Sequence, residues 1–321
     1  MIEKELLKLL RNSKNLLAFS AGVDSTALFF ILKEFNIKFD ITIVNYGLRE
    51  AAKEEIKYAK ELAKKFNKQI YISDAPKFHN NFEANAREFR YNFFKKIITQ
   101  NQYNNLITAH QLNDKIEWFL MRFSKGAGIN TLSSMQQIEN RDSYNLIRPL
   151  LNYTKEELLE YLERNSIKYF IDSSNFNKKY ERNKFRPLVN ELLKNSKEGF
   201  IKSFDILKQE AKILNSQYNI LKEVKDFRLI KIKTRDIAPQ AISSTLKELG
   251  YLISFREQQT LLKQNSLVIG RVWAIEIIDN LIYIAPYIKT KLPKEKKEYF
   301  RVNKIPPKVR GYLYIGNINP I

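Results

Sequence analysis

Short apolar runs alternate with helix-forming stretches through the first half of the chain. Four of the runs have the residue types of buried strands: Leu16–Phe19, Ile41–Val44, Ile70–Ile72 and Leu106–Thr108. Three helical patterns lie between them, near Thr26–Phe35, Ala52–Phe66 and Glu83–Thr99. This alternation predicts an α/β fold with a doubly wound parallel sheet, in which ligands bind beyond the carboxyl ends of the strands.

The pattern changes after Tyr153. Thr154 and Glu157 have the spacing of a capping box, and helices are expected from there to about Lys225. Residues Trp273–Ala285 then have the pattern of a β-hairpin that turns at Asp279-Asn280. We therefore predict an α/β nucleotide-binding domain over residues 1–190, a helical connector over 191–225 and a smaller α+β domain over 226–321.

Length and composition narrow the class of protein. A chain of 321 residues with 44% hydrophobic and 28% charged residues can fold as two globular domains. Residues 1–10 read as an amphipathic helix, and neither a signal peptide nor a membrane span is recognisable, so we expect a cytoplasmic protein without a membrane partner. The chain has no cysteine, which excludes disulfides, thiolate zinc sites and iron–sulfur clusters.

The net charge of +20 is distributed unevenly. Residues 1–150 carry 23 basic and 16 acidic side chains, whereas residues 151–321 carry 32 and 19. A polyanionic partner such as nucleic acid is the functional interpretation, and a lysine-rich solvated surface is the alternative. Because a simple compositional bias would usually raise glutamate as well, the charge favours nucleic acid.

The first candidate site is the loop that follows the first predicted strand. Ser20-Ala21-Gly22-Val23-Asp24-Ser25 joins an apolar run to a helix start. Small residues let the backbone approach a ligand closely, and a helix N-terminus attracts anions. The loop lacks the lysine of a Walker motif. Its functional interpretation is a phosphate cradle, and the alternative is an ordinary capped turn between strand and helix.

A second candidate follows the fourth predicted strand. If this segment is helical, His110, Asp114 and Glu117 share one face at positions i, i+4 and i+7. Carboxylates bind magnesium or a substrate ammonium, and an imidazole contacts phosphate or moves a proton. The alternative is a helix N-terminus with favourably placed acids and a histidine of no special role.

Two basic clusters complete the candidates. Arg87 and Arg90 are neighbours on the third helical pattern, where pairing with glutamates on a surface helix is the simpler interpretation. Residues 178–186 hold five basic side chains and two aromatic ones, as expected of an RNA contact or of a solvated helix face.

In order along the chain, these segments resemble tRNA(Ile)-lysidine synthetases, a family of PP-loop ATP pyrophosphatases. The matching motifs are Ser20-x-Gly22-x-Asp24-Ser25, Gly47-Leu48-Arg49, Glu83-Ala84-x-Ala86-Arg87-x-x-Arg90-Tyr91, Thr108-Ala109-His110-x-x-x-Asp114-x-x-Glu117, Arg148-Pro149-Leu150-Leu151, and Asp172-x-Ser174-Asn175 through Arg182-Asn183-x-x-Arg186. They cover about residues 14–190, and the remainder resembles the short form of the family by length and charge.

The resemblance implies that the first domain cleaves ATP to AMP and pyrophosphate and adenylates a tRNA. Free L-lysine then joins carbon 2 of the wobble cytidine of the isoleucine tRNA with a CAU anticodon, which changes the codon specificity from Met to Ile. The ATP-binding residues would be Ser20, Ala21, Gly22, Val23, Asp24 and Ser25, and Asp24 would also hold magnesium.

The resemblance also assigns the remaining roles. The catalytic residues would be Asp24, Arg90, His110, Asp114 and Glu117, of which Asp114 and Glu117 would hold the lysine. The tRNA contacts would come from Lys178, Lys179, Arg182, Lys184 and Arg186, together with the basic C-terminal domain. The sequence does not predict the oligomeric state.

Three positions depart from the family pattern. Ala21 replaces a glycine, Asn45-Tyr46 replaces the usual histidine, and Trp118 stands where threonine is common. Alanine adopts a positive φ only at a cost, so Ala21 bears on phosphate binding. The other two bear on the packing and polarity of the pocket, and every carboxylate is retained.

Three other functions compete. A tRNA thiolase needs a reactive cysteine or a cluster, which a chain without cysteine does not supply. A synthetase that forms amides of small metabolites has no need of such a basic surface and would turn over ATP without RNA. A non-catalytic RNA-binding protein would have no reason to keep Asp24, His110, Asp114 and Glu117 together.

Overall fold

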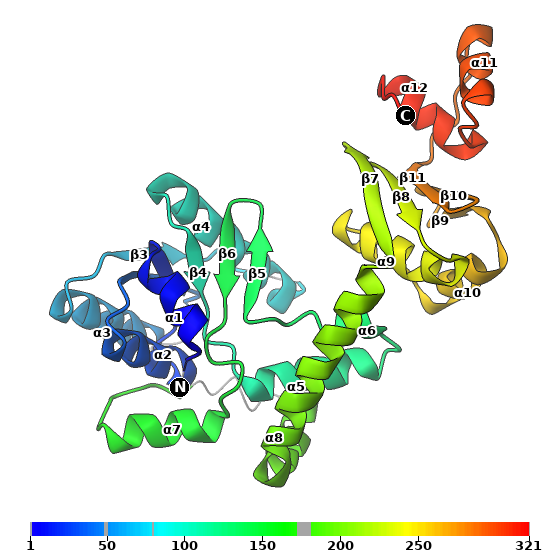
Figure 1. The fold of residues 1–321 in the computed structure, drawn as a ribbon. Helices are drawn as coiled ribbons and strands as arrows, with labels where there is room; N and C mark the ends of the chain where they lie inside the picture. Colours follow the sequence, from blue (N-terminus) through cyan, green and yellow to red (C-terminus); the bar gives the residue numbers. More distant parts are fainter. Residues whose placement is uncertain (1, 48–50, 79, 172–180, 321) are drawn as a thin grey trace. The chain divides into compact units, whose positions relative to one another are not determined.

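The computed structural model describes residues 2–47, 51–78, 80–171 and 181–320. The chain divides into two compact units, which are described separately (Figure 1). The first contains the chain up to residue 127 together with residues 131–203, and the second contains residues 128–130 and the chain from residue 204 onward. Each unit is built on its own sheet.

A six-stranded sheet forms the centre of the first unit. Its strands are β1 (Asn15–Ala18), β2 (Phe39–Asn45), β3 (Ile70–Asp74), β4 (Asn105–Ile107), β5 (Ile138–Arg141) and β6 (Tyr144–Ile147). The order is β3-β2-β1-β4-β6-β5, and every neighbouring pair is parallel except β5 with β6. The predicted parallel sheet is confirmed. From β1 the chain builds outward through β2 and β3 and then returns to β4, so the order switches beside β1.

Helices cover both faces of this sheet. The helices of this part of the chain are α1 (Lys4–Arg11), α2 (Val23–Glu34), α3 (Ala51–Lys65), α4 (Phe82–Asn101), α5 (Leu112–Phe123), α6 (Ile129–Leu132), α7 (Lys155–Arg164) and α8 (Glu181–Asn215). The first half of α6 and the part of α8 from residue 204 onward belong to the second unit. Leu17 of β1 packs in the cluster formed by α1, α2, α3 and α7, whereas its neighbour Leu16 packs against α4 on the opposite face. The doubly wound arrangement follows from this alternation.

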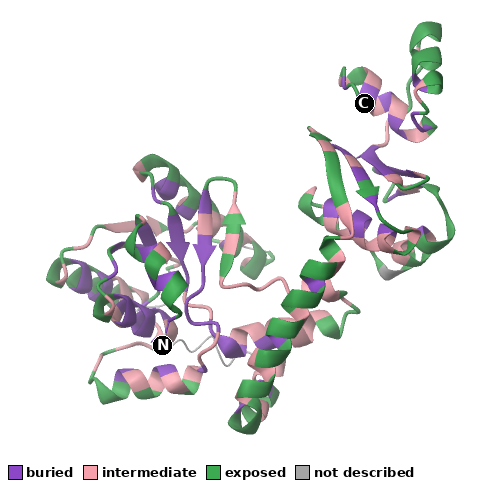
Figure 2. Ribbon diagram, viewed as in Figure 1, coloured by how far each residue is buried: buried purple, intermediate pink, exposed green. Residues whose placement is uncertain are grey.

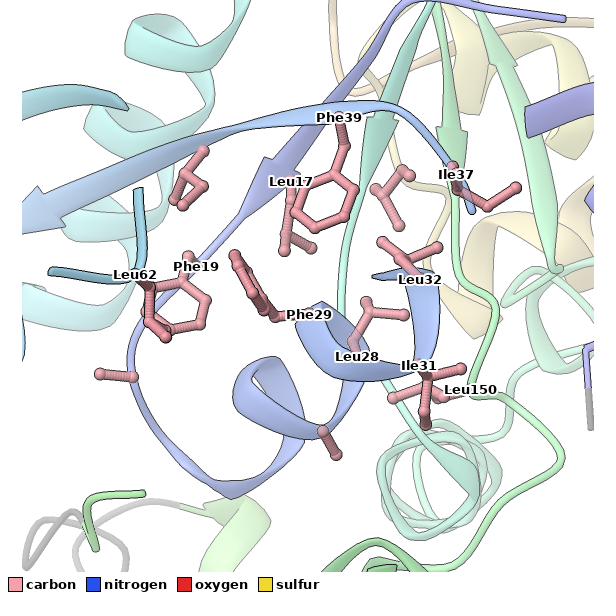
Figure 3. Packing of buried hydrophobic residues seen from close by; sticks show 14 of the residues in the cluster. Leu17, Phe19, Leu28, Phe29, Ile31, Leu32, Ile37, Phe39, Leu62 and Leu150 are labelled. Carbon is pink, nitrogen blue, oxygen red and sulfur yellow. The ribbon is translucent and has the colours of Figure 1, made fainter. Parts of the chain in front are cut away.

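The central strands β1, β4 and β6 are deeply buried, whereas the edge strands β3 and β5 are not (Figure 2). At the centre of the larger cluster, the ring of Phe29 on α2 meets the edges of Phe19 and Phe39, with centroid distances of 5.9 and 5.1 Å (Figure 3). These contacts hold the middle of α2 against the segments of β1 and β2, and so limit where the loop between β1 and α2 can lie.

The second unit is an antiparallel sheet with helices. Its strands are β7 (Tyr218–Val224), β8 (Phe227–Ile232), β9 (Ser266–Ile269), β10 (Trp273–Ile278) and β11 (Leu281–Pro286), in the order β7-β8-β11-β10-β9. The helices are η2 (Arg235–Ile237), α9 (Ala238–Glu248), α10 (Phe255–Lys263), α11 (Lys294–Val302), η3 (Pro307–Val309) and α12 (Arg310–Ile315). The predicted α+β composition is confirmed, and β10 and β11 form the predicted hairpin.

Local predictions differ in their outcome. The capping box of α7 is confirmed, since Thr154 Oγ1 accepts from the Glu157 amide at 3.2 Å and Glu157 Oε2 accepts from the Thr154 amide at 2.8 Å. The prediction that helices continue to Lys225 is wrong, because α8 ends at Asn215 and residues 218–224 form β7. Antiparallel pairing with β8 decides the conformation of this polar segment.

Within the residues that the structure describes, none of the helices combines the length and apolar character needed to cross a bilayer.

Candidate active site

The loop between β1 and α2 is tied together by its own serines. Ser25 Oγ accepts a hydrogen bond from the Ser20 amide at 3.2 Å, lies 3.1 Å from Ser20 Oγ and donates to the Gly22 carbonyl at 3.2 Å. The Ala21 carbonyl accepts from the Phe170 amide at 3.0 Å. Gly22 is the extended N-cap of α2. The first amides of α2 are thus held at the carboxyl end of β1, where they can meet an anion.

Ala21 adopts a left-handed conformation, with φ of 58°, and its side chain is fully buried. A left-handed residue costs an L-amino acid about 1–2 kcal/mol, a cost that glycine avoids. The sequence departs from the family pattern at the one position of this loop where glycine is conformationally favoured. The hydrogen bonds of the Ser25 hydroxyl and of the Phe170 amide stabilise the loop in this conformation.

Asp24 follows in the first turn of α2. Burial raises the pKa of its carboxyl group, and the positive charges of Lys155, Arg182 and Arg186 act in the opposite direction. Its Oδ1 atom is buried and has no hydrogen-bond partner within the described part of the chain. Magnesium in nucleotide sites is usually held by one or two carboxylates together with phosphate oxygens. An unpartnered carboxylate oxygen at a phosphate loop fits that role.

The condition that would place His110 on one helical face with Asp114 and Glu117 is not met, because His110 precedes the helix. The helix α5 begins at Leu112, and its N-cap is Gln111, whose side chain accepts from the Asn113 amide at 2.5 Å. Asp114 Oδ2 accepts from the Gln111 amide at 3.0 Å and completes a capping box. His110 therefore lies in the loop after β4, whereas Asp114 and Glu117 share a helical face at i and i+3.

His110 is held neutral. Burial lowers its pKa well below the ordinary value, and the positive charges of four arginines lower it further: Arg148, Arg87, Arg182 and Arg90. Its Nδ1 atom lies 2.9 Å from Thr108 Oγ1. A neutral imidazole surrounded by guanidinium groups can accept a proton or contact an anion that those groups attract.

Arg182 and Arg186, on the first turns of α8, reach the two carboxylates of α5. Arg182 forms ion pairs with both Asp114 and Glu117, and its Nε lies 2.5 Å from Glu117 Oε2. Arg186 Nε donates to Glu117 Oε1 at 3.3 Å. Burial nevertheless raises the pKa of Glu117. The positive charges of Arg186 and Lys155 lower this pKa, and the negative charge of Asp24 raises it.

The structure adds two residues that sequence reasoning missed. Asn113 is buried on α5, donates to Asn190 Oδ1 at 2.9 Å and accepts from the Lys155 amide at 3.1 Å, so it joins α5 to α7 and α8. Lys155 begins α7, and its charge acts on both Asp24 and Glu117. The sequence marked Lys155 only as a residue inside a capping box.

Arg90 lies half-buried on α4, and its charge acts on both His110 and Tyr46. Tyr46, which with Asn45 stands where the family pattern has a histidine, donates from its hydroxyl to the Ala86 carbonyl at 3.2 Å. Its ring also meets Phe82. This departure therefore packs β2 against α4 without removing a charged group from the site.

The other predicted residues are placed as follows. Lys184 is exposed on α8, midway between Arg182 and Arg186. Lys178 and Lys179, like the Leu48-Arg49 and Asp172–Asn175 parts of the motifs, lie outside the described residues. The contacts of Arg182 and Arg186 with carboxylates were not predicted, and a contact of this segment with tRNA stays a prediction.

Comparisons with known proteins find relatives over nearly the whole chain. The family described as "PP-loop domain" matches residues 1–193. The tRNA(Ile)-lysidine synthase of Wolinella succinogenes is 43% identical over 97% of this chain and 96% of its own length. That of Campylobacter jejuni strain RM1221 is 42% identical over 99% and 98%, and that of Helicobacter pylori strain 26695 is 40% identical over 97% and 92%.

A solved structure supports the fold. The U34-tRNA thiolase NcsA from Methanococcus maripaludis covers 64% of this chain and 75% of its own, with a TM-score of 0.53 and 18% identity. That structure contains a [4Fe-4S] cluster, whereas this chain has no cysteine to ligate one. Sequence identity over nearly the whole length, together with the PP-loop match, shows that the chain belongs to the tRNA(Ile)-lysidine synthase family of PP-loop enzymes.

Proposed function

We propose that this chain uses ATP to join free L-lysine to the wobble cytidine of the isoleucine tRNA with a CAU anticodon. The main support is one structural observation. Arg182 forms ion pairs with both Asp114 and Glu117, and its charge also acts on Asp24 of the phosphate loop, so the loop and the carboxylate pair belong to one charged cluster beyond the carboxyl ends of β1 and β4. Enzymes of this sheet class place their ligands at that edge, beside the switch in strand order.

The first step activates the base. The carbonyl oxygen at carbon 2 of the cytidine attacks the α-phosphorus of ATP, the bond to the β-phosphate oxygen breaks, and pyrophosphate leaves. The amides at the start of α2 and the hydroxyl of Ser20 would bind the pyrophosphate. Asp24 would hold magnesium, which offsets the phosphate charge when it is bound. The arginines around His110 would attract the α-phosphate.

The second step transfers lysine. The ε-amine attacks carbon 2 of the adenylated base, the bond from carbon 2 to the AMP oxygen breaks, and AMP leaves with one proton lost from the nitrogen. Asp114 and Glu117 would hold the lysine before the attack. At pH 7 only roughly one free lysine in several thousand has a neutral ε-amine, so the site has to take a proton.

Two groups in the site are suited to take that proton. Glu117 has a pKa that burial raises, which makes its carboxylate a stronger base than an exposed one. His110 is neutral and also able to accept. Either group alone could accept the proton. We assign the lysine contact to Asp114 and Glu117, with His110 and Arg90 beside them.

The tRNA would be bound through its phosphates. The second half of the chain carries most of the +20 net charge, and Lys184 on α8 is exposed next to the site. Lys178, Lys179, Arg182 and Arg186 belong to the same predicted RNA contact. The wobble base has to leave its stack for this chemistry, which costs least in a single-stranded anticodon loop.

Pyrophosphate release with and without tRNA tests this proposal. Release with ATP, magnesium and lysine should require a tRNA with a CAU anticodon and should stop when the wobble cytidine is replaced by uridine. Equal release without RNA would instead indicate a synthetase for small metabolites, and no release at all would indicate a non-catalytic RNA-binding protein.

A further inference from the structure

One side chain occupies both proposed lysine contacts. Arg182 pairs with Asp114 and with Glu117, the two carboxylates that the proposed function assigns to the lysine ammonium. A planar guanidinium with several N–H donors can bridge two carboxylates, whereas an ammonium is a compact point charge. In this structure the site is therefore already filled by a cation of the chain itself.

The charges of the cluster show why this contact matters. The carboxylates of Asp114 and Glu117 face the guanidinium groups of Arg182 and Arg186, so two negative charges meet two positive ones. The Glu117 side chain is 2% exposed, which leaves little water to screen an added charge. A lysine ammonium added to this balanced cluster would be an excess cation, so a guanidinium has to leave its carboxylates first.

Arg182 is the guanidinium placed to leave. Its side chain is 42% exposed, against 24% for Arg186, and it stands one turn nearer the start of α8. The negative charge of Asp24 in the phosphate loop also acts on it, so it lies within the field of that loop. The phosphates of ATP would bring several negative charges to the same loop.

We propose that Arg182 is an internal substitute for the substrate ammonium and that ATP draws it toward the phosphate loop, which frees Asp114 and Glu117 for lysine. This inference rests on the proposed function. It makes the binding of ATP and lysine mutually favourable. Because coupling between two ligands is reciprocal, lysine should strengthen ATP binding by the same factor. Lysine would then bind mainly after ATP, when the cytidine can be adenylated.

Binding of labelled lysine to the full chain tests the coupling. Equilibrium dialysis would measure the lysine Kd with and without α,β-methylene ATP and magnesium, in the absence of tRNA. For the unaltered chain we expect the nucleotide to lower the Kd by roughly fivefold or more. In Arg182→Gln, lysine should bind tightly without nucleotide, and the nucleotide should change its Kd less than about twofold, close to the absence of coupling.

Two further variants keep the test interpretable. Lys194→Gln removes a surface charge on the same helix, where Lys194 forms an ion pair with exposed Glu191 at 2.7 Å, and it should retain full coupling. Arg182→Lys keeps the charge but loses the bridge between two carboxylates, so its coupling should be intermediate. Circular dichroism of each variant would establish that it folds.

The outcomes separate the inference from the function on which it rests. Weaker lysine binding in Arg182→Gln without nucleotide, or coupling equal to that of the unaltered chain, would overturn the inference. If the unaltered chain neither binds lysine under any nucleotide condition nor transfers it to tRNA, the proposed function fails as well. If transfer proceeds but the lysine KM responds equally to ATP in both proteins, only the inference fails.

Discussion

The side-chain amide of Asn113 on α5 donates to the side-chain oxygen of Asn190 on α8 at 2.9 Å, across 77 positions of sequence. Asn190 lies one helical turn beyond Arg186, so this bond holds the start of α8 where its arginines meet the carboxylates of α5. This hydrogen bond therefore joins α5 to α8 beside the carboxylates, through two amides that have no role in the proposed reaction.

Replacing Asn190 should loosen that tie. Asn190→Ala leaves the buried Asn113 without its acceptor, which should lower the free energy of unfolding of the first unit by about 1–3 kcal/mol. Urea unfolding followed by the fluorescence of Trp118, in a Trp273→Phe background, measures this unit alone. Asn190→Asp keeps an acceptor oxygen and should lose less. Equal losses of stability in the two variants would show that the hydrogen bond between Asn113 and Asn190 is not the cause.

The carboxylate pair should be needed for lysine and dispensable for tRNA. Asp114→Asn or Glu117→Gln should reduce lysine transfer at limiting lysine by about 100-fold, which corresponds to about 2.7 kcal/mol of lost interaction. The affinity for tRNA, measured by filter binding, should stay within about twofold, since it rests on phosphate contacts elsewhere. Glu163→Gln, on the exposed side of α7, is the matched control. Unchanged transfer in Asp114→Asn would refute the assignment.

Asp24 should show opposite effects on stability and on activity. Because burial raises its pKa, the charged form is disfavoured by folding, and Asp24→Asn should leave the thermal midpoint unchanged or raise it. Pyrophosphate release should fall by roughly 100-fold or more, as expected when a metal-binding carboxylate is lost. A destabilised but fully active Asp24→Asn variant would show that the carboxylate is structural.

Position 21 should tolerate glycine and reject branched side chains. Ala21→Gly relieves the left-handed strain of about 1–2 kcal/mol but gives up a buried methyl group and adds unfolded-state freedom, so stability should change by less than about 1 kcal/mol. Ala21→Val should cost more than about 2 kcal/mol, because a β-branched residue fits neither the positive φ nor the filled space. Denaturant unfolding of the two variants provides the comparison. Similar losses in both would contradict the conformational explanation.

His110 should make stability depend on pH. Its folded-state pKa lies well below the ordinary 6.5, so below pH 6.5 the unfolded chain binds a proton that the folded chain does not. The contribution of neutral His110 to the free energy of unfolding is fully present above pH 6.5. It is lost as the pH falls toward the folded-state pKa, by at most about 1.4 kcal/mol per pH unit. Urea unfolding at pH 7, 6 and 5 should therefore give a shallower decline for His110→Asn. Parallel declines would show that His110 titrates normally.

Local patterns predicted the parallel sheet and the strand, loop and helix around residues 20–25 well. The apolar run of β1, the small residues of the loop and the start of α2 lie within a dozen positions, so one segment specifies the cradle. The strands β5 and β6 were not predicted, because a segment as short and polar as Ile138–Arg141 has no strand pattern of its own and gains its structure from pairing.

The arrangement of the site was less accessible to sequence reasoning. The N-cap role of Gln111 moves His110 off the helix, and the spacing of Gln111 to Asp114 was the available signal. Lys155 reaches Asp24 because α7 packs on α2, and Arg182 reaches Glu117 across 65 positions. Contacts of this kind depend on how distant helices pack, which a single sequence does not encode locally.

Transfer of labelled lysine to tRNA tests the proposed function most directly. Deacylated tRNA would be incubated with the protein, ATP, magnesium and radiolabelled lysine, and then treated with mild alkali that hydrolyses aminoacyl esters. The proposed function predicts ATP-dependent label that survives alkali, because the lysine is bonded to a base. Pyrophosphate release without stable label would contradict it and would indicate another acceptor for the activated phosphate chemistry.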